Sequence, residues 1–208
     1  MLKLYRININ HFKDPLEDKR LLQLVDDSRR QKVLRYLMPD DRKRSLGAGI
    51  IIRKILYENG LSEGCLKYSE NGKPVADDVF FNVSHGGDYV VGVASDCEIG
   101  CDIEKNGNAP LEVAERYFYL SELEYIRSAA DKNRAFFTLW TLKESYMKMT
   151  GRGMSLPLDS FEVVPQGEEF LLGKSVEKGC FFKTAEFDSH IFSVSRELPF
   201  TLDPTDFY

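Results

Sequence analysis

The sequence Gly100-Cys101-Asp102-Ile103-Glu104 forms one short strand around which the chain is organised. Side chains alternate between the two faces of a β-strand, so Asp102 and Glu104 share one face while Cys101 and Ile103 point into a core. Two carboxylates on one face repel each other unless a cation lies between them. Oxygen ligands without His or Cys suit Mg²⁺. Taken alone, this spacing is more typical of a solvated strand face. The neighbouring motifs decide between that interpretation and a metal site.

A second stretch, Trp140-Thr141-Leu142-Lys143-Glu144-Ser145, lies in the strongest helical pattern of the chain, residues 133–150. Trp140, Glu144 and Lys148 are four positions apart, which places them on one face of that helix. Glu144 can supply a third carboxylate to the site predicted on the strand. We expect Trp140, the only tryptophan, to anchor the helix in the core beneath that site.

Composition limits the possible classes of protein. The chain has 208 residues, of which 43% are hydrophobic and 29% charged, which is typical of one large globular domain or two small ones. A net charge of −5 does not indicate a nucleic-acid-binding protein. Four cysteines without C-x-x-C spacing predict reduced thiols in a cytoplasmic protein, and no zinc site. No apolar run approaches the roughly 20 residues of a membrane span, and the N-terminus does not resemble a signal peptide.

Periodicity predicts helices combined with antiparallel strands, an α+β fold. Residues 106–110, Asn-Gly-Asn-Ala-Pro, form the best internal boundary, so we expect two α+β halves at 1–105 and 106–208. The expected helices are 15–37 with a break near 26–28, 41–58, 111–118, one opening with a capping box at Ser121, and 133–150. The expected strands are 2–9, a hairpin of 79–84 with 89–94, then 98–104, 160–164, 168–173, 179–187 and 190–196.

Three further groups of residues suggest an anion site, each with a plainer alternative. Basic residues gather at 29–35 and again at 42–44, where they form either a solvated face or a phosphate-binding patch. Ser84 and His85 end a strand and precede Gly86-Gly87. His85 is therefore either a structural residue of the turn or part of a loop that contacts phosphate. Lys143 and Lys148 flank Glu144 and either pair with acids or neutralise phosphates.

Six short motifs occur together in one order. They are N-G-K-P at 71–74, F-N-V-S-H at 81–85, G-C-D-I-E at 100–104, R-Y-F at 116–118 with Glu122, W-T-L-K-E-S at 140–145 and G-R-G at 151–153. In this order and spacing the chain resembles the phosphopantetheinyl transferases, in the longer, surfactin-synthetase-activating (Sfp-type) branch. The resemblance extends from about Arg29 to Phe161. At position 101 the family commonly has Ile where this chain has Cys.

The resemblance implies a pseudo-dimer of two similar α+β halves, with coenzyme A and Mg²⁺ bound in the cleft between them. It assigns the metal to Asp102, Glu104 and Glu144. The residues that it assigns to the coenzyme are Ser84, His85 and Lys148 at the phosphates, Lys73 near the adenine, and Arg29, Lys32 and Lys43 toward the 3′-phosphate. Lys143, beside Glu144, is a further candidate for neutralising phosphate charge, on the chemistry of the reaction rather than on the resemblance.

The implied reaction transfers 4′-phosphopantetheine from coenzyme A to a serine of an acyl or peptidyl carrier protein. Phosphoryl transfer needs charge neutralisation and alignment more than covalent help from the enzyme. Glu144, or a water that it holds, is the first candidate for the base, and Glu122 the second. Two rival readings stay open, a Mg²⁺-dependent nucleotide phosphohydrolase and a non-catalytic coenzyme A-binding module. We expect a monomer that binds neither nucleic acid nor membrane.

Overall fold

The computed structural model describes residues 2–175, 177–203 and 205–207. Its α-helices are α1 (Asp27–Arg35), α2 (Pro39–Glu58), α3 (Leu111–Tyr117), α4 (Leu120–Ser128) and α5 (Lys132–Met149). Its strands are β1 (Lys3–Asn8), β2 (Lys67–Tyr68), β3 (Pro74–Val75), β4 (Phe80–Gly86), β5 (Tyr89–Ser95), β6 (Ile99–Lys105), β7 (Val163–Gln166), β8 (Glu169–Leu172), β9 (Phe181–Phe187) and β10 (His190–Arg196). Short 3-10 turns at 9–11, 19–24, 63–65, 153–155 and 158–160 complete the described elements.

The first half is a three-stranded antiparallel sheet with one long helix against it. The strand order is β1-β5-β4, and β4 and β5 form the predicted hairpin. Helix α2 starts at Pro39, whose fixed φ suits a first helical turn, and its apolar face lies on β5. Ile51, Ile55 and Val90 belong to the resulting core. The predicted break near residues 26–28 is confirmed, because a 3-10 turn at 19–24 precedes α1.

The second half is a five-stranded antiparallel sheet in the order β6-β10-β9-β8-β7, crossed by α5. Two hydroxyl pairs tie α5 to β10, Thr141 Oγ1 to Ser193 Oγ at 2.7 Å and Ser145 Oγ to Ser195 Oγ at 2.6 Å. Gly100 lets α5 approach β6 closely. A Cβ there would lie 2.1 Å from the carbonyl oxygen of Ser145. The backbone of the helix therefore lies directly on the backbone of the strand.

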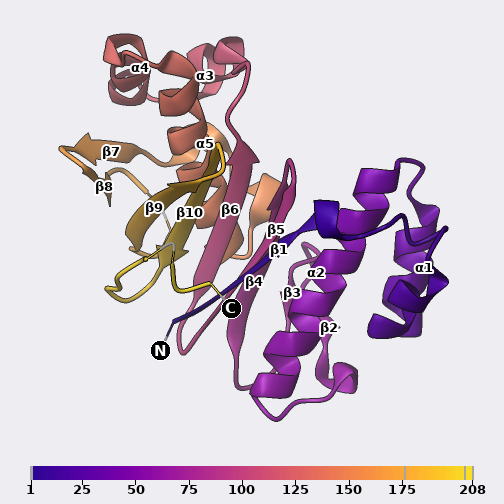
Figure 1. Ribbon diagram of the computed structural model, residues 1–208. Helices are drawn as coiled ribbons and strands as arrows, with labels where there is room; N and C mark the ends of the chain where they lie inside the picture. The colour runs from indigo at the N-terminus through magenta and orange to yellow at the C-terminus, as the bar shows by residue number, and fades with distance from the viewer. Residues whose placement is uncertain (1, 176, 204, 208) are drawn as a thin grey trace.

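The two halves meet where β4 runs beside β6 (Figure 1). These two strands belong to different sheets, and a side chain links them: the Cys101 N–H donates to Asn82 Oδ1 at 3.0 Å. Gly86 keeps the approach close, since a Cβ there would lie 2.2 Å from the carbonyl oxygen of Ile103. A side chain at position 86 would push β4 and β6 apart. The carboxyl end of β4 and the middle of β6 are therefore neighbours.

The pairing of β6 differs from the division between the halves that the sequence suggested. Strand β6 pairs with β10 along its whole length, from Ile99 opposite Arg196 to Lys105 opposite His190. Residues 99–105 therefore pair within the sheet of the second half, whereas the sequence pattern placed them with the first; the division at 1–105 and 106–208 stays a prediction. The loop at 106–110 connects two parts of one unit.

The start of α4 also differs from the expectation. The helix begins at Leu120, and Glu122 Oε2 accepts the N–H of Tyr119 at 2.8 Å. The capping box therefore joins Tyr119 and Glu122 and starts two residues before Ser121, where the sequence predicted it. In the described part of the chain, none of the helices has both the length and the apolar character needed to cross a bilayer.

Candidate active site

One pocket at the joint of the halves gathers most of the predicted site residues. It has a volume of about 450 Å³. The end of β4 contributes one wall, β6 the floor and α5 the opposite wall. The lining residues are Val83, Ser84, His85, Asp102, Glu104, Trp140, Glu144 and Lys148.

Asp102 lies at the centre of this pocket and is 4% exposed. Its Oδ1 accepts the hydroxyl of Ser84 at 2.7 Å and the ammonium of Lys148 at 2.5 Å, and Lys148 Nζ also donates to Ser84 Oγ at 2.9 Å. Its Oδ2 is buried and has no hydrogen-bond partner among the described residues. A buried carboxylate oxygen without a partner is costly, so this atom suits a ligand that supplies positive charge.

Glu104 and Glu144 surround Asp102 with further negative charge. Burial, together with the charges of Asp102 and Glu144, raises the pKa of Glu104 to about 7. Burial and Asp102 likewise raise the pKa of Glu144, against the opposing effect of Lys148. Three carboxylates that face one pocket destabilise one another unless a cation neutralises them.

Replacing Glu104 should therefore stabilise the metal-free protein in a pH-dependent way. A carboxyl whose pKa is raised from 4.5 to about 7 by folding loses stability as the pH rises through that interval. We expect Glu104→Gln to raise the free energy of unfolding by about 1–3 kcal/mol at pH 8 and to have little effect at pH 4. Urea unfolding in the presence of a chelator, at pH 8 and at pH 4, measures both free energies. Glu112→Gln, at an exposed position on α3, is the control. Equal effects of Glu104→Gln at both pH values would contradict the crowding of these carboxylates.

The donor set fits a hard divalent cation. All three acids offer oxygen, and Asp102 Oδ2 is free to bind. Among the described residues, no group of three or more His, Cys, Asp or Glu side chains is already close enough together to hold a metal ion. Lys148 supplies the positive charge beside Asp102 in this structure. A metal at this site would share Asp102 with that lysine.

Lys148 and His85 bring a charged and a neutral nitrogen group to the pocket. Burial opposes the charge of Lys148, but Asp102 and Glu144 outweigh burial and raise its pKa, so the ammonium is charged at neutral pH. The pKa of His85 is lowered by desolvation of its ring and by Lys148 and Arg44. His85 is therefore a neutral hydrogen-bonding group near pH 7 that can gain a proton when an anion approaches.

Trp140 lines the pocket, and the expectation that it lies in the core beneath the site is wrong. The side chain is half-buried and stacks on Phe136, with ring centroids 5.8 Å apart and planes at 16°. Leu139 and Leu142, its neighbours on α5, are fully buried. The four-residue spacing with Glu144 already placed Trp140 on the site face.

We expect Trp140→Ala to lower activity more than stability. Truncating a half-buried side chain should cost about 1–3 kcal/mol, whereas loss of the pocket wall should raise the KM for the substrate that packs there. Leu139→Ala, at a fully buried position one residue away, should instead cost about 2–5 kcal/mol. Melting curves and steady-state kinetics on both variants test this. A larger stability loss in Trp140→Ala than in Leu139→Ala would restore the core assignment.

Glu122 and Lys143 do not reach the pocket. Both side chains are 0% exposed, and Lys143 Nζ lies 2.8 Å from Glu122 Oε1. The remaining donors of Lys143 bond to the carbonyl oxygens of Leu158 at 3.0 Å and Phe161 at 2.8 Å. Glu122 Oε1 also accepts the N–H of Val163 at 2.7 Å. Both side chains bond to partners inside the second half. The predicted roles, base for Glu122 and coenzyme contact for Lys143, therefore do not suit them.

The basic residues of the first half lie outside the pocket. Lys32 is exposed on α1, and its pKa is lowered by partial desolvation and by the charge of Arg29. Lys43 pairs with Asp40 on α2. Arg44 was not singled out from the sequence, although it stands in the same basic run. Its Nη1 donates to the carbonyl of Gly87 at 2.8 Å, which ties α2 to the turn after His85.

Lys73 lies at a second, smaller pocket of about 300 Å³. Its Nζ is 3.3 Å from the carbonyl oxygens of Ile99 and Met149 and 3.5 Å from Glu98 Oε2. Burial lowers its pKa, and Glu98 opposes this. The pocket also includes Pro74, Val75, Phe80 and Phe81, which gives it an apolar wall for a flat ring.

Two family models match the chain in succession, "4'-phosphopantetheinyl transferase, N-terminal" over residues 15–97 and "4'-phosphopantetheinyl transferase superfamily" over residues 98–195. The chain belongs to the 4′-phosphopantetheinyl transferase superfamily. The change from one match to the next, at residues 97 and 98, falls just before β6, where the sheet pairing also divides the halves.

Curated relatives agree with this membership. The chain is 34% identical to the 4′-phosphopantetheinyl transferase ffp of Bacillus subtilis over 197 residues, which cover 90% of this chain and 88% of the relative. It is 32% identical to Sfp of Bacillus subtilis (strain 168), with the same coverage. It is 35% identical to gsp of Aneurinibacillus migulanus over 160 residues, 74% of this chain and 68% of the relative. The resemblance to the Sfp-type branch is thereby confirmed.

Proposed function

We propose that this enzyme transfers 4′-phosphopantetheine from coenzyme A to a serine hydroxyl of a carrier protein. The observation that carries the proposal is the pocket at the joint, where Asp102, Glu104, Glu144 and Lys148 face one another. Transfer of a phosphoryl group depends on groups that neutralise and align its charge, and this pocket supplies them. Membership of the superfamily supports the same reaction.

The chain's own cations bind the coenzyme in this proposal. Lys148 and His85 line the pocket and contact the pyrophosphate. Arg29 and Lys32, with Lys43 at the start of α2, bind the 3′-phosphate. Burial and, second to it, the charge of Arg29 lower the pKa of Lys32, and an anion between the two cations would relieve their repulsion. Lys73 and the apolar wall beside it hold the adenine.

Asp102, Glu104 and Glu144 would hold Mg²⁺, with the unpartnered Oδ2 of Asp102 as one ligand atom. When bound, the ion supplies positive charge to the pyrophosphate and relieves the repulsion among the three acids. Ser84 keeps Asp102 oriented through its hydroxyl, which donates to Oδ1.

The chemical step is an attack by the carrier's serine oxygen on the β-phosphorus of coenzyme A. The new P–O bond forms as the bond to adenosine 3′,5′-bisphosphate breaks, and the electron pair leaves with that product. Glu144, directly or through a water that it holds, accepts the serine proton. Lys148 stabilises the charge that develops on the departing oxygen.

Mass spectrometry of an apo carrier protein incubated with the enzyme, coenzyme A and Mg²⁺ tests the proposal. We expect a mass increase of one phosphopantetheine group, dependent on the carrier's serine and on the enzyme. Hydrolysis of coenzyme A without modification of the carrier would favour a phosphohydrolase. Tight binding of coenzyme A without any product would favour a binding module.

A further inference from the structure

The turn between α1 and α2 presents apolar side chains to water. We call residues Tyr36, Leu37 and Met38 the Leu37 loop. Leu37 is 90% exposed and Met38 63%, and Leu34 beside them on α1 is also exposed. Single exposed apolar residues are ordinary on a protein surface, but a contiguous group marks a candidate interaction site.

A buried arginine fixes the backbone of this loop. Arg42 is 6% exposed, and its Nη1 donates to the carbonyl oxygens of Tyr36 and Leu37, both at 2.8 Å. Its Nε donates to Asp14 Oδ1 at 2.8 Å, and this pairing lowers the pKa of Asp14 to about 2. The loop is therefore held in one conformation while its side chains point outward. A surface ordered in advance loses less entropy when a partner binds.

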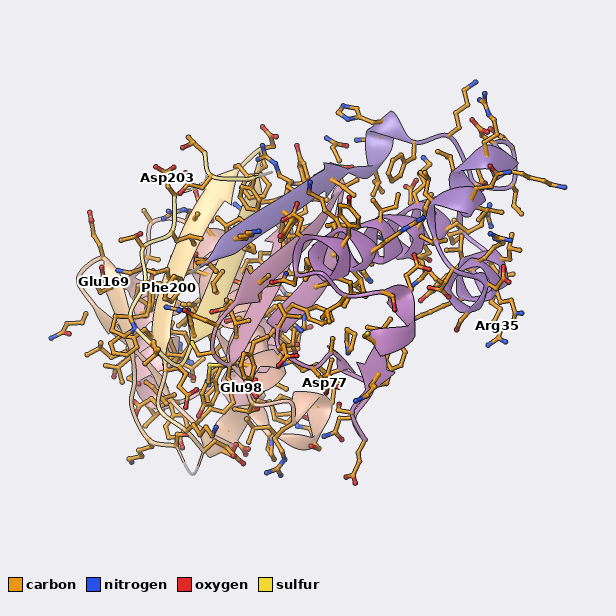
Figure 2. All side chains as sticks on the ribbon, turned by 90° about the horizontal axis from the view of Figure 1, so that it is seen from below. Arg35, Asp77, Glu98, Glu169, Phe200 and Asp203 are labelled. Atoms are coloured by element: carbon orange, nitrogen blue, oxygen red, sulfur yellow. The ribbon has the colours of Figure 1, made fainter. Side chains whose placement is uncertain are left out.

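The surface beside the Leu37 loop carries a small excess of basic side chains in a chain that is acidic overall. Residues 26–44 contain seven basic and four acidic side chains, against a net charge of −5 for the whole chain, and two of the basic ones, Arg29 and Arg42, are buried. Arg30, Lys43 and Arg44 pair with nearby acids on their own helices. Within the described ranges, no salt bridge engages Arg35, and Figure 2 shows its side chain at the outer edge of the molecule. The complement of this surface is an acidic one with an apolar recess.

The Leu37 loop is connected to the pocket through α2. Arg42 holds the loop, and two residues later Arg44 donates to the carbonyl of Gly87, beside His85 in the pocket lining. In Figure 1 the start of α2 lies at the same end of the first half as the tip of the β4–β5 hairpin, the edge to which His85 belongs. A protein seated on this loop would thus lie against the rim over which a serine must enter.

We propose that the Leu37 loop and Arg35 form a docking surface for the acidic carrier protein that supplies the serine. The inference rests on the proposed function. Leu37 and Met38 enter an apolar recess of the carrier, and Arg35 faces its carboxylates. Apolar anchors of this kind dominate binding at interfaces, while rim charges govern the rate of encounter and its salt dependence.

The test compares Leu37→Ser/Met38→Ser with the wild type at saturating coenzyme A and varied apo acyl carrier protein. We expect the KM for the carrier to rise about tenfold or more, since two anchors are lost. The kcat and the Kd for coenzyme A should stay within about twofold, because neither residue lines the pocket. Tyr57→Ser is the matched control: Tyr57 is 81% exposed but lies near the other end of α2, roughly 27 Å along its axis at 1.5 Å per residue.

Arg35→Glu provides an independent second variant. We expect it to raise the KM for the carrier at low salt and to lose most of this effect at about 1 M salt, where charges are screened within roughly 3 Å. An unchanged KM in both variants, with normal wild-type transfer, would overturn the docking surface and leave the proposed function intact. Absence of transfer by the wild type would overturn both. Loss of binding to anionic lipid vesicles, with the carrier KM unchanged, would assign the loop to a membrane surface instead and so also overturn the proposal.

Discussion

Asp102→Asn is expected to abolish detectable transfer while the protein stays folded. The change removes the charge from the one acid that contacts Ser84 and Lys148 and that has a buried oxygen free for a cation. A lost electrostatic contact of this kind typically costs roughly 10²-fold or more in kcat. The mass of the carrier protein after incubation with the variant and coenzyme A measures this loss of transfer.

Two effects of Asp102→Asn on stability oppose each other. Lys148 loses its ion pair, whereas Glu104 and Glu144 are relieved of a like charge. We therefore expect only a small change in Tm. The conservative control is Ser84→Ala, which removes one hydrogen bond to Asp102 and leaves its charge. Wild-type turnover by Asp102→Asn at saturating Mg²⁺ would refute the place of Asp102 in the reaction.

Breaking the buried pair of Glu122 and Lys143 is expected to cause the largest loss of stability. Each side chain is fully buried, and each polar atom of the pair has a partner in the other side chain, in Tyr119 at the start of α4, or in the segment at 158–163. Removing one member leaves the other as an uncompensated buried charge. Glu122→Ala should therefore lower the free energy of unfolding by about 3–5 kcal/mol.

A surface pair of similar length provides the comparison. Glu169 Oε1 lies 2.6 Å from Lys183 Nζ, with side chains 58% and 33% exposed. Glu169→Ala should cost at most about 1 kcal/mol, because water replaces the lost partner. Urea unfolding of both variants measures the difference. If Glu122→Ala were as stable as Glu169→Ala and had lost its activity, Glu122 would return as the candidate base.

The spacing of residues predicted the centre of the pocket well. Alternation along residues 100–104 placed Asp102 and Glu104 on one face, and the four-residue spacing placed Glu144 and Lys148 on another. The structure brings both faces to the same pocket. Local periodicity was sufficient here because each pair lies within a single strand or helix.

Lys143 shows how adjacency in sequence can mislead. It is next to Glu144, but one residue turns a helix by about 100°, which places Lys143 with Leu139 and Met147 on the buried face. The helical spacing of Lys143 with Leu139 and Met147 thus already indicated that Lys143 is buried. Its ion-pair partner, Glu122, could not be identified without the fold. The position of β6 was equally hidden, because its pairing with β10 joins residues more than eighty positions apart.

Gly100 sets the distance between β6 and α5, the two elements that carry the acids and the lysine of the site. With no side chain between them, β6 and α5 touch backbone to backbone, and a single methyl group at this position would lie 2.1 Å from Ser145 O and 2.3 Å from Met149 N, where ordinary contacts are 3.4–4 Å. Strand and helix would have to separate by about 1 Å to admit it. Misplacement on that scale can cost roughly 10²-fold in rate. Gly100 therefore fixes how closely Asp102 on the strand approaches Lys148 on the helix, because its lack of a side chain lets the two backbones meet.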